Sequence, residues 1–319
     1  MIGAGHASTV AAQILYSVSS GPGFPLVSID PTTGAVQTLQ PTGSFSGINS
    51  ISAFDPLRRR LFFLADAAGV QTLVVVNVQT GAVATHAIPL TGASYAFLQY
   101  DPTTRTLYSV ASSPGFPVVT IDPDTGVVTT LQPTGSFNGV SNNISAFDAA
   151  GRRLFFVVDA AGVPTLVVVN VQTGAVATQP IPVSGGSYVF LQYDPATGVL
   201  YSVASTPGFP LVSIDPNTGA VQTLQPTGSF SGLFSSSALD PSGGRLFFLA
   251  DAAGVQTLVV VDLVTGTVTT HTVSVPGGIV VFLEFAGLLT NVPAMGSFGK
   301  MLTLLALGLA GFFLARQLS

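Results

Sequence analysis

The 319-residue chain contains no cysteine and no tryptophan, and only 7% of its residues are charged. Without cysteine there are no disulfides, no thiolate metal ligands and no cysteine nucleophiles. The formal net charge of −5 argues against electrostatic binding of nucleic acid. Residues 1–287 also lack a long apolar pattern with the 3.6-residue period of a helix. A hydrophobic share of 47% nevertheless excludes a disordered chain and allows a sizeable core.

The scarcity of charge leaves the surface to Thr, Ser, Gln and Gly. Soluble domains usually carry about a quarter charged residues, and like charges help to keep copies of a protein apart. Two interpretations therefore remain open. The surface is either a neutral extracellular one, or that of a subunit that packs against copies of itself.

Two short motifs recur at a regular spacing along the first 287 residues. Leu-Tyr-Ser-Val begins at Leu15, Leu107 and Leu200, and Leu-Phe-Phe begins at Leu61, Leu154 and Leu246. Successive copies of one motif are separated by 92 or 93 residues, and the two series interleave. The chain thus consists of three tandem copies of a double unit, or six units of about 46 residues.

Each unit has the pattern of four short strands. In the second unit we expect strands at 51–55, 61–65, 72–78 and 82–88, of which the third is rich in Val. Tight turns of the form Asp-Pro-x-Thr-Gly begin at Asp30, Asp122 and Asp215, where Pro and Gly supply the turn dihedrals and Asp bonds nearby backbone N–H groups. Six units of four strands predict an all-β fold, a six-bladed β-propeller with three tandem double blades.

The ends of the repeat predict how the ring closes. The chain begins without an innermost strand and ends with a spare one, since Phe282-Leu283-Glu284-Phe285 aligns with the stretches that begin at Phe97 and Phe190. We therefore expect strand 279–285 to be the innermost strand of the blade that holds 15–29. The pattern over residues 13–287 resembles bacterial surface propellers of the YVTN type, a resemblance of architecture that implies no activity.

The character of the sequence changes after Gly287. Residues 301–315 carry no charge, and from Pro293 onward the run is long enough to span a bilayer, so we expect a hydrophobic helix at 301–316. The alternative is a helix docked on the propeller, but the run is apolar all round.

A short motif lies in the linker 288–300 that precedes this helix. It comprises Val292, Pro293, Phe298 and Gly299 and resembles the start of IPTL-CTERM sorting tails, with Phe298 in place of the usual Trp and Met295 in place of Leu. The resemblance implies that a membrane-embedded protease of the exosortase type is a partner. The first residues, 1–12, are interpreted either as the remnant of a signal peptide or as a floppy cap.

Candidates for chemistry are few. The three histidines are His6, His86 and His271, and the last two are expected to be exposed on outer strands. Asp66, Asp159 and Asp251 end equivalent strands, where they either bond the local backbone or converge as an acidic ring; we favour the local role. Glu284 is expected near the central channel, in place of Gln99 and Gln192. We expect no catalytic residues, no cofactor and no metal.

Six loop phenylalanines are the best candidates for a binding face. They are Phe24, Phe116 and Phe209 between second and third strands, and Phe45, Phe137 and Phe230 between one blade and the next. Both kinds of loop open at the same face of a propeller. The rings either form an exposed apolar patch for a partner or fold inward and fill the gaps between blades.

These features favour a secreted or cell-surface structural or adhesive module in bacteria, held at the membrane by its tail. Its partner is then a surface ligand or a copy of itself. One alternative is a subunit that assembles into an extracellular filament or lattice. The other is a metal-dependent hydrolase such as a lactonase, which predicts a metal ringed by carboxylates in the channel. It is disfavoured because a catalytic site needs loops that differ between blades, and these loops are nearly identical.

Overall fold

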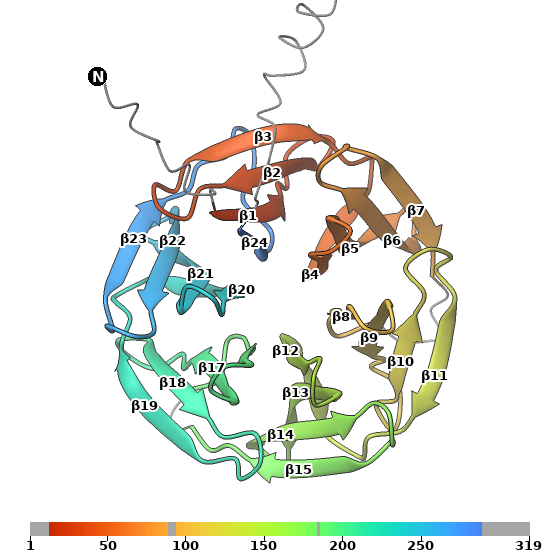
Figure 1. Ribbon diagram of the computed structural model, residues 1–319, viewed down its shortest axis with the longest axis vertical. Helices are drawn as coiled ribbons and strands as arrows, with labels where there is room; N and C mark the ends of the chain where they lie inside the picture. Colours follow the sequence, from red (N-terminus) through yellow and green to blue (C-terminus); the bar gives the residue numbers. More distant parts are fainter. Residues whose placement is uncertain (1–12, 89–93, 184–185, 289–319) are drawn as a thin grey trace, which may run out of the picture. The chain divides into compact units, whose positions relative to one another are not determined.

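The computed structural model describes residues 13–88, 94–183 and 186–288, which form six four-stranded antiparallel sheets. The sheets are arranged around a central axis as the blades of a β-propeller (Figure 1). The predicted six-bladed fold is confirmed, and residues Gln13–Gly287 make up a compact unit. The expected segment 1–12, the sorting motif of Val292, Pro293, Phe298 and Gly299, and the expected helix 301–316 lie outside the described residues.

Twenty-four strands are found in the described residues, and they fall into four concentric positions. The innermost strands are β24 (Glu284–Leu288), β4 (Gly47–Asp55), β8 (Gln99–Asp101), β12 (Gly139–Asp148), β16 (Gln192–Asp194) and β20 (Gly232–Asp240). The second strands are β1 (Gln13–Val18), β5 (Arg60–Ala67), β9 (Thr106–Val110), β13 (Arg153–Ala160), β17 (Val199–Val203) and β21 (Arg245–Ala252).

The third and outermost strands complete each blade. The third strands are β2 (Pro25–Ile29), β6 (Val70–Asn77), β10 (Val118–Ile121), β14 (Val163–Asn170), β18 (Pro210–Ile214) and β22 (Val255–Asp262). The outermost are β3 (Val36–Pro41), β7 (Val83–Ala87), β11 (Val128–Gln132), β15 (Val176–Pro180), β19 (Val221–Pro226) and β23 (Val268–Thr272).

The ring closes where β24 pairs with β1, which joins the end of the propeller to its beginning (Figure 1). The regular strand covers Glu284–Leu288, so it begins later than the expected start at 279, and upstream of it Val280 makes an isolated bridge to Ser19. The same break precedes β8, where Ala96, Phe97 and Leu98 are all buried.

The core lies between neighbouring blades. The second strand of a blade is packed on both of its faces, so Leu61–Ala65 in β5 are fully buried. Alternate side chains of this strand pack against different neighbouring blades. Phe62 packs with Tyr100 of the third blade, whereas Phe63 packs with Phe282 of the first. The Leu-Phe-Phe motif is therefore a continuous apolar run because both faces of its strand are covered.

The Asp-Pro-x-Thr-Gly turns have the predicted geometry. The Asp30 carboxylate accepts a 2.8 Å hydrogen bond from the Thr32 N–H, and its equivalents Asp122 and Asp215 do the same two residues on. The Gly that ends each turn has a positive φ, 73° at Gly34, which fits the left-handed position. These aspartates therefore act as turn formers.

Candidate functional site

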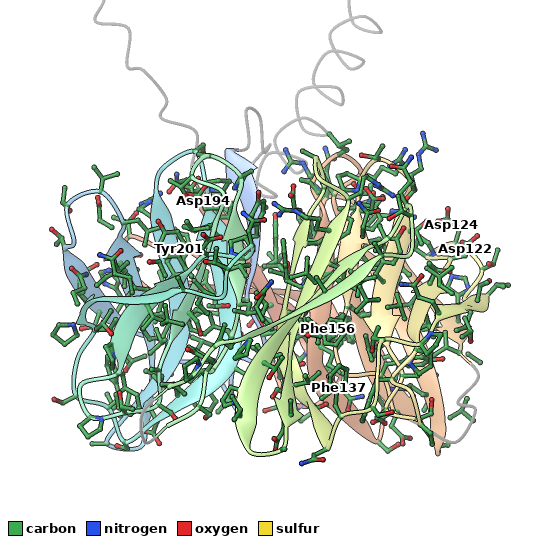
Figure 2. All side chains as sticks on the ribbon, turned by 90° about the horizontal axis from the view of Figure 1, so that it is seen from below. Asp122, Asp124, Phe137, Phe156, Asp194 and Tyr201 are labelled. Carbon is green, nitrogen blue, oxygen red and sulfur yellow. The ribbon has the colours of Figure 1, made fainter. Side chains whose placement is uncertain are left out.

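The six loop phenylalanines lie at one face of the propeller. Strands alternate in direction across a blade, so the loops from second to third strands and those that lead into the next blade open at the same face. Figure 2 shows Phe137 towards this face, and Asp122, Asp124 and Asp194 towards the opposite one. The topology places Gln13 and Gly287, where the chain enters and leaves the propeller, at that opposite face as well.

The phenylalanines form three equivalent pairs, one in each double blade. The ring centroids of Phe24 and Phe45 are 5.9 Å apart, and the pairs Phe116–Phe137 and Phe209–Phe230 are separated by 6.1 and 5.9 Å. Each pair packs on a different inter-blade core and is only half-buried. Neither interpretation of the sequence holds in full: the rings cap the gaps between blades, and each pair also remains partly exposed. We call the surface carrying the three pairs the aromatic face.

The backbone at the first member of each pair is strained. Phe24, Phe116 and Phe209 have φ values of 44°, 41° and 43°, in a region that bulky side chains rarely adopt. Such a conformation costs about 1–3 kcal/mol and persists only where the surrounding structure enforces it. Its repetition in all three copies marks the aromatic face as a candidate binding surface.

The second candidate site is the central channel, which holds two polar cavities of about 50 and 220 Å³. Five side chains line both cavities along with that of Leu98: Ser52, Gln99, Gln192, Ser237 and Glu284. Ser145 lines the smaller cavity. Together, one residue from each innermost strand makes a ring of alternating serines and amide or carboxyl side chains, which we call the channel ring.

Hydrogen bonds join the members of the channel ring in pairs across neighbouring blades. The Gln99 amide donates to the Ser145 hydroxyl at 3.1 Å, and the Gln192 amide donates to the Ser237 hydroxyl at the same distance. At the third position the Ser52 hydroxyl donates to a Glu284 carboxylate oxygen at 2.7 Å. Burial raises the pKa of Glu284 to about 7, and the bond from Ser52 offsets part of that shift.

Two polar atoms near the channel ring have no hydrogen-bond partner among the described residues. They are the Ser236 hydroxyl and the Asn143 side-chain carbonyl oxygen, and both residues line the smaller cavity. Ser236 is only 3% exposed. Asn143 is the extra residue that makes the fourth blade's innermost strand longer than its equivalents, and its φ is 62°. Sequence reasoning missed both residues.

The other polar candidates have structural roles. Asp66, Asp159 and Asp251 each accept a hydrogen bond of 2.6–2.7 Å from the N–H of the Gly three residues on. They therefore bond the local backbone, which is the role that we favoured from the sequence. Hydrogen bonds, that from Ser46 foremost, lower the pKa of Asp66. The three aspartates do not form an acidic ring, because each carboxylate is turned into its own loop.

The prediction that His86 and His271 are exposed is wrong, since both are half-buried. Each lies against the turn glycine of the following blade. A Cβ built on Gly126 would be 2.6 Å from the His86 Cβ, and one built on Gly34 would be equally close to that of His271. The outermost strands thus help to join one blade to the next.

In the part of the chain that the structure describes, no three His, Cys, Asp or Glu side chains gather closely enough to hold a metal ion. Among the described residues that line the two channel cavities, Glu284 alone carries a carboxylate. Within the same described ranges, no helix has the length and apolar character needed to cross a membrane.

The fold and the repeats define the chain as a six-bladed β-propeller. It belongs to the family described as "Repeat of unknown function (DUF6923)", whose sequence model matches residues 62–278. No curated protein is significantly similar to the chain.

Solved structures share its fold at low sequence identity. TolB from Acinetobacter baumannii is 16% identical with a TM-score of 0.65, and the match covers 87% of this chain and 67% of TolB. A chain of the nidogen/laminin complex is 12% identical with a TM-score of 0.65, over 86% of this chain and 98% of that one. At these identities the similarity shows the fold alone.

Proposed function

We propose that the chain is a secreted or cell-surface bacterial propeller with a structural or adhesive role, and that it holds its partner through the aromatic face. The observation that carries this proposal is the threefold repetition of the half-buried phenylalanine pairs. Aromatic side chains bury large areas on binding with little loss of side-chain entropy, and they are enriched in protein interfaces. Strained phenylalanines in every copy support a role beyond filling space.

The position of the two ends of the propeller supports an attached surface module. Gln13 and Gly287 lie at the face opposite the aromatic face, so attachment through residues after Gly287 leaves the aromatic face free for a partner. The resemblance of 292–299 to sorting tails supports such an attachment, with a membrane-embedded protease as the processing partner. An apolar segment of this kind holds a chain at the membrane until the protease acts.

Location and processing are tested on the native protein in the producing bacterium. We expect protease added to intact cells to degrade the propeller, and mass spectrometry of the mature chain to find an N-terminus beyond Met1 and a C-terminus before Ser319. A chain that keeps both termini and resists external protease until the cells are lysed would overturn the surface location.

The adhesive role is tested with two matched triple variants. Phe45→Ser, Phe137→Ser and Phe230→Ser remove three rings from the aromatic face. Leu57→Ser, Val127→Ser and Val264→Ser remove three apolar side chains that are 74%, 60% and 84% exposed at the opposite face. Cells producing the first variant should lose adherence, whereas cells producing the second should keep it. Equal adherence of both, with both folded by circular dichroism, contradicts the proposal.

A second candidate is self-assembly, which the same exposed residues favour. Apolar side chains on one face and aromatic pairs on the other allow head-to-tail stacking, and such contacts build open filaments. The two triple variants separate the candidates. A stacking subunit loses its sedimenting polymers with either variant, whereas a module that binds another molecule is affected only by the first.

A further inference from the structure

The channel ring leaves three side-chain oxygens without a donor among the described residues. The Gln99 and Gln192 amides are each fixed by their nitrogens, which donate to both the hydroxyl and the carbonyl of a serine in the next blade. Their carbonyl oxygens receive no hydrogen bond from the described residues. One carboxylate oxygen of Glu284 accepts the hydrogen bond from Ser52. Its other oxygen also receives no hydrogen bond from the described residues.

These three oxygens belong to equivalent positions around the propeller axis. Gln99, Gln192 and Glu284 begin the innermost strands β8, β16 and β24, which belong to alternate blades. All three side chains line both the smaller and the larger cavity. They therefore surround the channel at the level where the two cavities meet.

The charge of Glu284 has no cationic partner in this surrounding. Neither cavity is lined by Lys, Arg or His among the described residues, and within the same residues the carboxylate accepts its hydrogen bond from the neutral Ser52 hydroxyl. Charges held inside proteins are normally paired with an opposite charge or coordinate a metal ion. The channel supplies neutral oxygens around one negative charge, a surrounding suited to a hard cation.

A second, independent observation lies on the wall of the smaller cavity. The Ser236 hydroxyl is buried and unpartnered next to Ser237 of the channel ring, and the Asn143 carbonyl oxygen is unpartnered in the fourth blade, two blades away around the same cavity. A buried polar atom without a partner is unfavourable by about 1–3 kcal/mol. Two residues with such atoms line the same cavity as the ring, which indicates that the cavity wall is built for a polar occupant.

We propose that the channel ring binds a calcium ion, with Gln99, Gln192 and Glu284 as the protein ligands. Ca²⁺ takes about 6–8 oxygen ligands, including amide carbonyls, carboxylates and water, in flexible geometry. Three side chains do not complete this coordination shell, and the larger cavity has room for water molecules as the remaining ligands. With a single carboxylate, the affinity belongs in the range of extracellular calcium modules, a Kd of about 10⁻⁴–10⁻³ M. Mg²⁺ requires a tighter octahedral site and binds more weakly.

The repeat itself provides the variants that test this site. Glu284→Gln puts at the third position the residue that the other two copies carry, so the fold should accept it. Gln99→Glu makes the reverse change and adds a second carboxylate. Asp124→Asn is the matched control, because it also removes one negative charge and the equivalent position in the next copy is Asn217.

Calorimetric titration of the full chain with CaCl2 up to about 10 mM should give one binding event. Glu284→Gln should weaken it by about tenfold or more, Gln99→Glu should tighten it by about tenfold, and Asp124→Asn should leave it unchanged. CaCl2 should also raise the Tm of the wild-type chain more than MgCl2 does.

Two results would overturn the proposal. One is the absence of both heat and Tm shift in the wild-type chain over that range. The other is equal Ca²⁺ affinity of the wild-type chain and a folded Glu284→Gln variant, which would place any bound ion elsewhere. Neither result bears on the aromatic face, so the adhesive role is tested separately.

Discussion

At the scale of single residues, Glu284 should make the stability of the propeller depend on pH. Its pKa is raised from 4.5 to about 7 in the folded chain, so between these values the unfolded chain loses a proton that the folded chain keeps. The free energy of unfolding therefore falls as pH rises from about 4.5 to about 7, by up to about 3 kcal/mol, and is level beyond.

Glu284→Gln should abolish this slope. In urea denaturation with EDTA present, the variant should match the wild type near pH 4 and exceed it near pH 8. The difference should grow through the interval between the two pKa values. Parallel profiles for the two proteins would show that Glu284 titrates alike in the folded and unfolded chains.

A second test at this scale concerns Asp55, which ends β4 and is fully buried. It accepts a 2.8 Å hydrogen bond from the Tyr100 hydroxyl and bonds from two turn N–H groups, and these bonds hold the pKa of its carboxyl below the usual value against the opposing effect of burial. Tyr100→Phe should lower the free energy of unfolding by about 1–2 kcal/mol, because a bond to a charged group is lost.

The third copy shows that this blade edge accepts a phenylalanine when another donor serves the aspartate. Phe285 stands where the first two copies have Tyr100 and Tyr193, and there Gln13 supplies a 2.7 Å hydrogen bond to the equivalent Asp240. Asp55→Ala should be more damaging than Tyr100→Phe, by about 2 kcal/mol, because it leaves Arg60 without its buried partner. Equal effects in chemical denaturation would contradict this account of the blade edge.

At the scale of elements, the contact between an outermost strand and the next turn predicts unequal effects of two glycine substitutions. Gly126 and Gly198 have the same φ of 74°, but a Cβ would meet the His86 Cβ at 2.6 Å in the first case and nothing within 4 Å in the second. Gly198→Ala should cost about 1 kcal/mol from backbone strain alone. Gly126→Ala should cost at least about 1 kcal/mol more, because the blades must also move apart.

Thermal unfolding of both variants measures the difference directly. If Gly126→Ala and Gly198→Ala lower the Tm equally, the outermost strand does not pack on the next turn as described. His86→Ala in the Gly126→Ala background provides a further check. It should not remove the clash, since the close atom is the Cβ that alanine retains.

The elements that could be predicted from the sequence are those fixed by local chemistry. Leu61–Phe63 and its copies gave the second strands, and the Asp-Pro-x-Thr-Gly turns gave the hairpins, because their residue types act within a few positions. The start of β24 at Glu284 was less accessible. It depends on the burial of Phe282 and Leu283 against two different blades, which is a long-range effect.

The candidate sites were only partly predictable for the same reason. The six phenylalanines could be assigned to one face from topology, but their pairing and positive φ depend on how each loop packs. For the channel ring, the substitution of Glu284 for glutamine was visible in the sequence. The serines that face it come from neighbouring blades, about 46 residues away at Ser145 for Gln99, and nothing local distinguishes them from other strand serines.

At the scale of the whole molecule, the account rests on the closure of the ring by a non-covalent strand pair. Ser19 and Val280 form an antiparallel bridge, flanked by hydrogen bonds from the Ser20 N–H to the Ile279 carbonyl and from the Val281 N–H to the Val18 carbonyl. Such a non-hydrogen-bonded pair brings its Cα atoms to about 4.5 Å, within the range that a disulfide can join. Because the chain has no cysteine, two introduced cysteines can pair only with each other within one molecule.

The most direct test is therefore the double variant Ser19→Cys, Val280→Cys, with Ser19→Cys, Ser112→Cys as the control that joins different blades. The closed ring predicts a quantitative intramolecular disulfide in the first variant, seen by mass spectrometry of its peptides, a higher Tm under oxidising conditions, and no such bond in the control. A folded first variant whose two thiols remain free, or pair only between molecules, would contradict the closed six-bladed ring.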